Sequence, residues 1–194
     1  MIYLSASMQQ SQVASETPAS TKIRNYEWAL YAEYESKWTP RFSSNLGIRL
    51  NSYRLGKKDS RFIEPRAVVS YQLNDSWTLK GAYARTSQFT HQLSNTGVGF
   101  PTDLWVPATE KVPIAVAQQV SAAIEKKFKN GYSVVFETYY KKMSNVVSYK
   151  DNAYFVDVTT NQETNFWENK LTSGQGWAYG YEALLKKNAG KLKG

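Results

Sequence analysis

Aromatic and acidic side chains in two long connecting segments, 87–115 and 144–176, could bind a ligand. The rings offer stacking surfaces and a carboxylate offers a hydrogen-bond acceptor, a combination that suits ligand pockets. Connecting segments of this length are uncommon unless they are functional. The residues singled out as candidate ligand-binding residues are Phe100, Asp103, Trp105 and Trp167. The alternative is that these aromatic side chains pack the loops onto themselves, with three prolines stiffening the first loop.

Residues suited to catalysis or metal binding are scarce. The chain has one His and no Cys, which excludes a disulfide framework, a thiolate zinc site and a cysteine nucleophile. We expect His91 to make a loop hydrogen bond rather than to bind a metal, because no second His or Cys accompanies it. Glu33 and Glu35 lie two residues apart, like the carboxylate pair of a glycosidase, but basic residues on the same face can pair with them. We therefore predict no enzyme, no cofactor and no metal.

Composition narrows the classes of protein further. The chain has 194 residues, a formal net charge of +8 and 14% aromatic residues, which suits one domain or a piece of one. Nucleic acid is not a predicted partner, because much of the basic excess lies in turns and chain ends, where binding would be loose and salt-dependent. No segment approaches the run of about 18 apolar residues that a membrane-spanning helix needs.

From residue 26 onward, apolar and polar residues alternate with a period of two, as they do along a strand with two unlike faces. The pattern predicts seven strands, and an eighth that begins after 188–190. Their ranges are 26–37, 41–51, 63–73, 77–83, 116–128, 132–141 and 177–186. The polar face of these strands carries seven acidic and eight basic residues, whereas the apolar face carries only Lys126. This contrast sets the register of each strand.

The predicted connections alternate in length. Short ones lie near 38–40, 74–76, 129–131 and 188–190, and longer ones near 54–61, 87–115 and 144–176. A meander would collect the short turns at one end and the long loops at the other, as in outer-membrane barrels. Aromatic residues flank the short turns, where an interfacial girdle would lie: Trp38, Trp77, Phe128 and Tyr132. A soluble β-sandwich that binds carbohydrate is the alternative, because soluble antiparallel sheets alternate in the same way.

A series of motifs between residues 64 and 187 includes loop residues as well as strand residues. They are Pro65-Arg66, Tyr71-Gln72-Leu73, 77–85, Leu93-Ser94-Asn95, Gly97-Val98-Gly99, 101–109, 139–143, Asn145-Val146-Val147 and 172–180. Over about two thirds of the chain, these motifs resemble the later barrel strands of TonB-dependent outer-membrane receptors of the nutrient-uptake type.

The resemblance implies a Gram-negative outer-membrane barrel of about 22 strands with a plugged lumen. Such receptors import chelated metals, vitamins, oligosaccharides or peptides, using energy passed through TonB. The polar face would line the lumen and the apolar face would meet lipid. The implied partners are outer-membrane lipid, TonB and the plug domain through a full-length parent, and a surface lipoprotein.

Within these 194 residues we expect no plug, no TonB-contacting box, no signal peptide and no C-terminal strand ending in an aromatic residue. We therefore expect an all-β, antiparallel up-and-down meander that is part of a transmembrane β-barrel. Residues 26–194 would form the barrel segment, and residues 1–25 a loop or mobile N-terminal tail. Unpaired edge strands and an exposed apolar face promote association, so we expect the isolated segment to self-associate.

Overall fold

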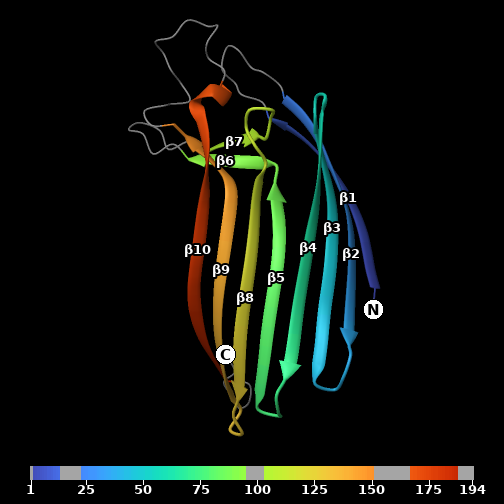
Figure 1. Cartoon of the computed structure of the whole chain (residues 1–194), viewed down its shortest axis with the longest axis vertical. Coiled ribbons are helices and arrows are strands. Elements are labelled where there is room, and N and C mark those ends of the chain that lie inside the picture. The colour runs from blue at the N-terminus through green and yellow to red at the C-terminus, as the bar shows by residue number, and fades with distance from the viewer. Residues whose placement is uncertain (1, 14–22, 95–102, 151–166, 188–194) are drawn as a thin grey trace, which may run out of the picture.

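The computed structural model describes residues 2–13, 23–94, 103–150 and 167–187. Within these ranges, eight antiparallel strands form one sheet in the order β1-β2-β3-β4-β5-β8-β9-β10, and β6 and β7 form a separate hairpin (Figure 1). The strands are β1 (Ile2–Val13), β2 (Ile23–Lys37), β3 (Phe42–Leu55), β4 (Lys58–Gln72), β5 (Trp77–Gln88), β6 (Thr90–Ser94), β7 (Asp103–Pro107), β8 (Ala115–Lys127), β9 (Tyr132–Tyr149) and β10 (Leu171–Lys187). A 3-10 helix, η1 (Trp167–Lys170), precedes β10. No helix in the described part of the chain is long and apolar enough to cross a membrane.

The predicted all-β meander is confirmed, and each of the seven predicted strands is present. The N-terminal prediction of a loop or tail over residues 1–25 differs from the structure, because β1 pairs with β2 over twelve residues. Ser and Gln fill much of this strand, and it has no charged residue to contrast with its apolar ones. A prediction from alternation misses such a strand, because no charged residue marks one of its faces as polar. The predicted eighth strand after 188–190 lies outside the described residues.

The short turns predicted from the sequence lie together at one end of the sheet, which we call the turn end (Figure 1). They span residues 38–41, 73–76 and 128–131. The opposite end, which we call the loop end, carries the β6–β7 hairpin and η1.

The prediction of a longer loop near 54–61 is wrong. β3 continues to Leu55 and β4 begins at Lys58, so the two strands are joined by a two-residue turn. Gly56 in this turn has a φ of 58°, a left-handed conformation that glycine adopts without strain. The predicted 144–176 loop is also too long, because β9 extends to Tyr149 and β10 begins at Leu171.

The apolar face is continuous across the sheet. Leu50 pairs with Leu30 on one side and with Ile63 on the other, and Ile124 of β8 pairs with Phe136 of β9. These large side chains are open to the surroundings: the exposed fraction is 44% for Trp28, 44% for Ile48, 40% for Leu50 and 45% for Phe136. In the described ranges, no second sheet covers this face. A soluble sandwich would bury such a face, so the open apolar face agrees with the predicted partial barrel.

The polar face is braced by contacts that cross several strands. Glu33, Gly47 and Arg66 stand in register on β2, β3 and β4. Because Gly47 has no side chain, Arg66 reaches across β3, and its Nη2 lies 3.6 Å from Glu33 Oε2. The Arg66 guanidinium also lies 4.2 Å from the centre of the Tyr31 ring.

Candidate ligand-binding site

An open pocket of about 710 Å³ lies at the loop end, between the polar face of the sheet and the β6–β7 hairpin. Its size falls within the range of small-molecule sites. The wall combines two aromatic rings with charged and hydrogen-bonding groups: Glu27, Arg49, Asn51, Glu64, Thr86, Ser87, Gln88, Phe89, Thr90 and Trp105. Such a wall can stack on a flat ligand surface and hydrogen-bond to its edge.

The pocket lies where the sheet is split between β4 and β5. β4 pairs with β3 along its whole length, but its ladder with β5 begins only at Arg66, which pairs with Ala84. The preceding residue is Pro65, which has no amide hydrogen to donate to a ladder. The structure places the Pro65-Arg66 motif in the middle of β4, where the β4–β5 pairing ends.

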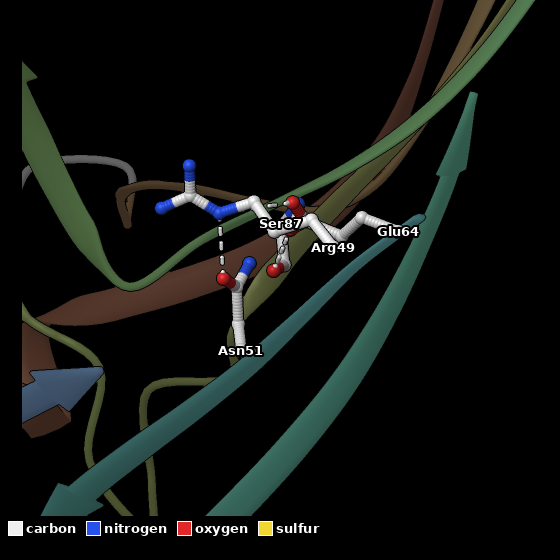
Figure 2. A network of polar contacts seen from close by, with 4 residues as sticks. All are labelled: Arg49, Asn51, Glu64 and Ser87. Carbon is white, nitrogen blue, oxygen red and sulfur yellow. Dashed lines mark hydrogen bonds and ion pairs between the residues drawn. The ribbon is translucent and has the colours of Figure 1, made fainter. Parts of the chain in front are cut away.

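Glu64 bridges this split. Its Oε1 accepts a 2.6 Å hydrogen bond from the Ser87 amide of β5 and a second from the Ser87 hydroxyl (Figure 2). The side chain of Glu64 is almost fully buried, and burying a carboxylate is costly unless hydrogen bonds or a positive charge compensate it. The amide and hydroxyl of Ser87 therefore replace the missing ladder bond.

Arg49 joins the same network from β3. Its Nε lies 3.9 Å from Glu64 Oε2 and donates a 2.7 Å hydrogen bond to Asn51 Oδ1 (Figure 2). The side chain is about half exposed, so the guanidinium can contact a ligand in the pocket. The wall thus holds two carboxylates, of Glu27 and Glu64, and one guanidinium.

The hairpin that roofs the pocket is anchored to the sheet by two apolar clusters. The first contains Tyr53, Phe89, Ala108 and Ile114, with Leu55 and Phe62 packed against it; the second contains Leu93, Val106, Val112 and Leu171, with Val147, Tyr149 and Trp167 packed against it. The rings of Tyr53 and Phe89 are stacked with centroids 5.0 Å apart. The Tyr53 hydroxyl also donates a 2.7 Å hydrogen bond to the carbonyl of Ala108.

The predicted role of His91 as the partner in a loop hydrogen bond is confirmed. It is buried on β6, and its Nε2 lies 3.0 Å from the carbonyl oxygen of Pro113. Burial lowers the pKa of the His91 imidazole, and the Pro113 carbonyl opposes this by a smaller amount. The neutral imidazole, which can donate Nε2–H to that carbonyl, is therefore favoured. Among the described residues, no cluster of three or more His, Cys, Asp or Glu could hold a metal.

The structure separates the four candidate ligand-binding residues. Trp105 of β7 lines the pocket with half of its surface exposed. Trp167, at the start of η1, packs against the second cluster, which is the packing role that the sequence left open for loop aromatics. Asp103 is the first residue of β7, but its side chain is not among those described. Phe100 lies outside the described residues. A ligand-binding role for these residues stays a prediction.

Sequence reasoning missed most of the pocket wall. Arg49, Glu64 and Glu27 are ordinary polar-face residues of three strands, and nothing in their spacing distinguishes them from the other charges of that face. The one available signal was Pro65, because proline inside an alternating strand marks an interrupted ladder.

A family model described as TonB dependent receptor-like, beta-barrel matches residues 4–191 of the chain. The match covers β1 to β10 almost completely. A comparison with curated proteins finds no match.

Proposed function

The chain belongs to the TonB-dependent receptor β-barrel family, a family of outer-membrane transport proteins, and from this premise we propose that it serves nutrient uptake. In this proposal its polar face lines the lumen, and the pocket beneath the β6–β7 hairpin receives the nutrient as it enters. The observation that carries the proposal is the position of Trp105 and Arg49 in one pocket at the loop end of the sheet. Long loops lie on the outer side of such barrels, so this pocket would open toward the medium.

The chemistry of the wall suits a ligand with a flat apolar surface and polar edges. Trp105 supplies stacking area, and Gln88 and the charged groups supply hydrogen bonds. Oligosaccharides, peptides, vitamins and chelated metals all offer such combinations, so the substrate class is left to experiment. The partners in this proposal are TonB, a plug domain and a surface lipoprotein.

The test is uptake by cells whose receptor contains this chain. Labelled chelated iron, a vitamin, an oligosaccharide and a peptide are supplied one at a time as the scarce nutrient. We expect one class to be taken up, and uptake but not surface binding to stop when TonB is removed. Uptake that is unaffected by the loss of TonB, or no dependence of any class on this receptor, would contradict the proposal.

A matched pair of variants tests the pocket. Trp105→Ala should lower the affinity for the imported nutrient by about tenfold, because an aromatic contact is worth about 1 kcal/mol or somewhat more. Trp177→Ala removes an equally large ring from the apolar face of β10, 69% exposed, and should leave affinity unchanged. An equal loss of affinity in the two variants would contradict the assignment of this pocket as the nutrient site.

A further inference from the structure

A second pocket, of about 600 Å³, lies on the opposite face of the sheet at the loop end. It is formed by β2, β3, β4 and the Gly56 turn, and its wall gathers three arginines beside two aromatic rings. The lining residues are Arg24, Tyr26, Trp28, Ser52, Arg54, Gly56, Asp59 and Arg61. With three guanidinium groups and one carboxylate, the lining carries a net charge of +2.

The register places the arginines at the border of the apolar face. Arg54 pairs with Tyr26 across β2 and β3, and Arg61 pairs with Ser52, which in turn pairs with Trp28. One step further toward the turn end, the same face carries Leu30, Leu50 and Ile63, all large and exposed. A ligand seated here would touch cations with one end and a wide apolar surface with the other.

Arg61 is held at this border by its neighbours. Its Nη2 lies 3.3 Å from Asp59 Oδ2, and Asp59 Oδ1 accepts a 2.9 Å hydrogen bond from the Ser52 hydroxyl. The Arg61 side chain nevertheless stays largely exposed, so most of its five donors are available to a ligand.

On two strands farther along the sheet, a basic residue again follows an apolar residue on the apolar face. On β5 and β9, Arg85 and Lys142 follow Tyr83 and Tyr140 on the apolar-face positions, and both pair with Gln118. Among the described residues of the apolar face, the loop-side border thus carries five basic side chains. Its turn-side border carries two, Lys126 over the Trp77 and Phe128 rings and Lys187 over the Tyr132 ring. On the apolar face, basic residues are therefore more numerous at the loop-side border.

We propose that the Arg24–Arg54–Arg61 cluster binds the phosphorylated headgroup of a glycolipid in the outer leaflet of the membrane. Arginine suits this ligand because its planar fork contacts phosphate oxygens in a bidentate manner. Tyr26 and Trp28 lie at the depth of the headgroups, and Leu30, Leu50 and Ile63 meet the acyl chains. A soluble anion such as free phosphate would use the cations but not the apolar surface beside them. This inference goes beyond nutrient uptake and can hold or fail independently of it.

The experiment measures binding of labelled lipid A by the 194-residue chain in detergent micelles. The two comparison ligands are lipid A from which the phosphates have been removed and free inorganic phosphate. We expect the phosphorylated lipid to bind at least about tenfold more tightly than the dephosphorylated one, because only the phosphates provide anionic oxygens for the three guanidinium groups. Equal binding of the two lipids, or competition by inorganic phosphate at the same concentration as lipid A, would overturn the proposal.

Two triple variants assign the effect to the cluster. Replacing Arg24, Arg54 and Arg61 with Gln should abolish the preference for phosphate. Replacing Lys127, Lys129 and Lys186 with Gln removes the same charge at the turn end and should preserve it. An equal loss in both variants would indicate general charge attraction and would contradict a specific site.

A third variant keeps the proposal testable if the variant with three Gln substitutions does not fold. Changing the three arginines to Lys keeps the charge but removes the bidentate fork, so the preference for phosphorylated lipid should fall to an intermediate value. The strand signal in circular dichroism reports whether each variant is folded. A lysine triple that is folded and binds with the full preference would refute the requirement for arginine.

Discussion

Gly47 allows one arginine to stabilise two strands at once. A Cβ at this position would lie 2.7 Å from Arg66 Nε and 2.8 Å from Arg66 Cγ, closer than any real contact. Gly47→Ala should therefore displace Arg66 from Glu33 and from the Tyr31 ring and lower the free energy of unfolding by about 1–2 kcal/mol. Urea unfolding in detergent micelles measures this change in the free energy of unfolding.

The control for this prediction is Gly174→Ala, because no atom lies within 4 Å of the Cβ that it would add. Gly174→Ala should change the free energy of unfolding by no more than about 0.5 kcal/mol. In an Arg66→Ala background, Gly47→Ala should cost much less than it does alone. A cost that is the same in both backgrounds would show that Arg66 is not the obstacle.

His91 makes the β6–β7 hairpin sensitive to pH. Because the pKa of its imidazole is lower in the folded hairpin than in an open one, the open state binds the proton more tightly. The stabilisation is fully present above the ordinary histidine pKa of about 6.5 and is lost as the pH falls below it. We expect hydrogen-exchange protection of the Val106 amide, corrected for the intrinsic rate, to decrease from pH 7.5 to about pH 5.

His91→Gln supplies the comparison for this titration. Its side-chain amide can still donate to the Pro113 carbonyl, but it carries no titratable proton. The protection of β6 and β7 in the variant should not change over the same pH range. A parallel decrease in both proteins would assign the pH dependence to another group.

At the residue scale, local sequence predicted the hydrogen bond of His91 but not the contacts of Gly47 and Glu64. A buried imidazole needs a hydrogen-bond partner, and the sequence offers no second His and no Cys with which His91 could share a metal. The space above Gly47 and the split beside Glu64 depend on residues from neighbouring strands, and no local spacing reveals them.

Among the elements, β9 contains an irregularity that links it to the segment preceding β8. The β9–β10 register shifts between Gly174 and Gln175, which pair with Val146 and Ser144, so Asn145 is the unpaired residue of a bulge. Asn145 has a φ of 60°, and its Nδ2 donates a 3.0 Å hydrogen bond to the carbonyl of Ile114. The bulge therefore joins β9 to the segment that leads into β8.

Two substitutions separate the backbone and side-chain contributions of this bulge. Asn145→Ala should lower the free energy of unfolding by about 2 kcal/mol, because it loses the hydrogen bond and because Ala tolerates the left-handed conformation less well than Asn. Asn145→Gly keeps the backbone conformation and should cost about 1 kcal/mol less. Equal losses in urea unfolding would show that the conformation contributes nothing.

The elements were predictable where two unlike faces alternate and not elsewhere. β2 and β8 follow directly from their alternation. β1 was missed because its polar residues are uncharged, and the β3–β4 turn was missed because Lys57 and Lys58 read as part of a loop. Hydrogen-bonded pairing with a neighbour, rather than side-chain pattern, decides where such strands begin and end.

At the scale of the whole molecule, the exposed faces and edges predict self-association in water. Within the described residues, β1 and β10 are each paired on one side only, and Tyr179 and Tyr181 are more than 75% exposed. We expect light scattering to detect oligomers or aggregates in plain buffer, and a smaller species when detergent covers the apolar face. A monodisperse monomer without detergent would contradict this expectation.

A matched pair of variants shows which face drives the association. Tyr179→Lys together with Tyr181→Lys adds two positive charges to the apolar face of β10 and should reduce it. Glu182→Lys changes the net charge by the same amount on the polar face and should leave the association unchanged. Equal behaviour of the two variants would point to charge alone.

The alternation by itself determined seven of the strands and which of their residues share a face, because the side-chain period of a strand is two and a slip by one residue would exchange the faces. Only the tertiary structure decided that Trp105 and Arg49 share a pocket, that Glu64 closes the split beside Pro65, and that three arginines meet at the border of the apolar face. Each of these depends on which strands lie side by side and on where a loop folds back, and those distances join residues that are far apart along the chain.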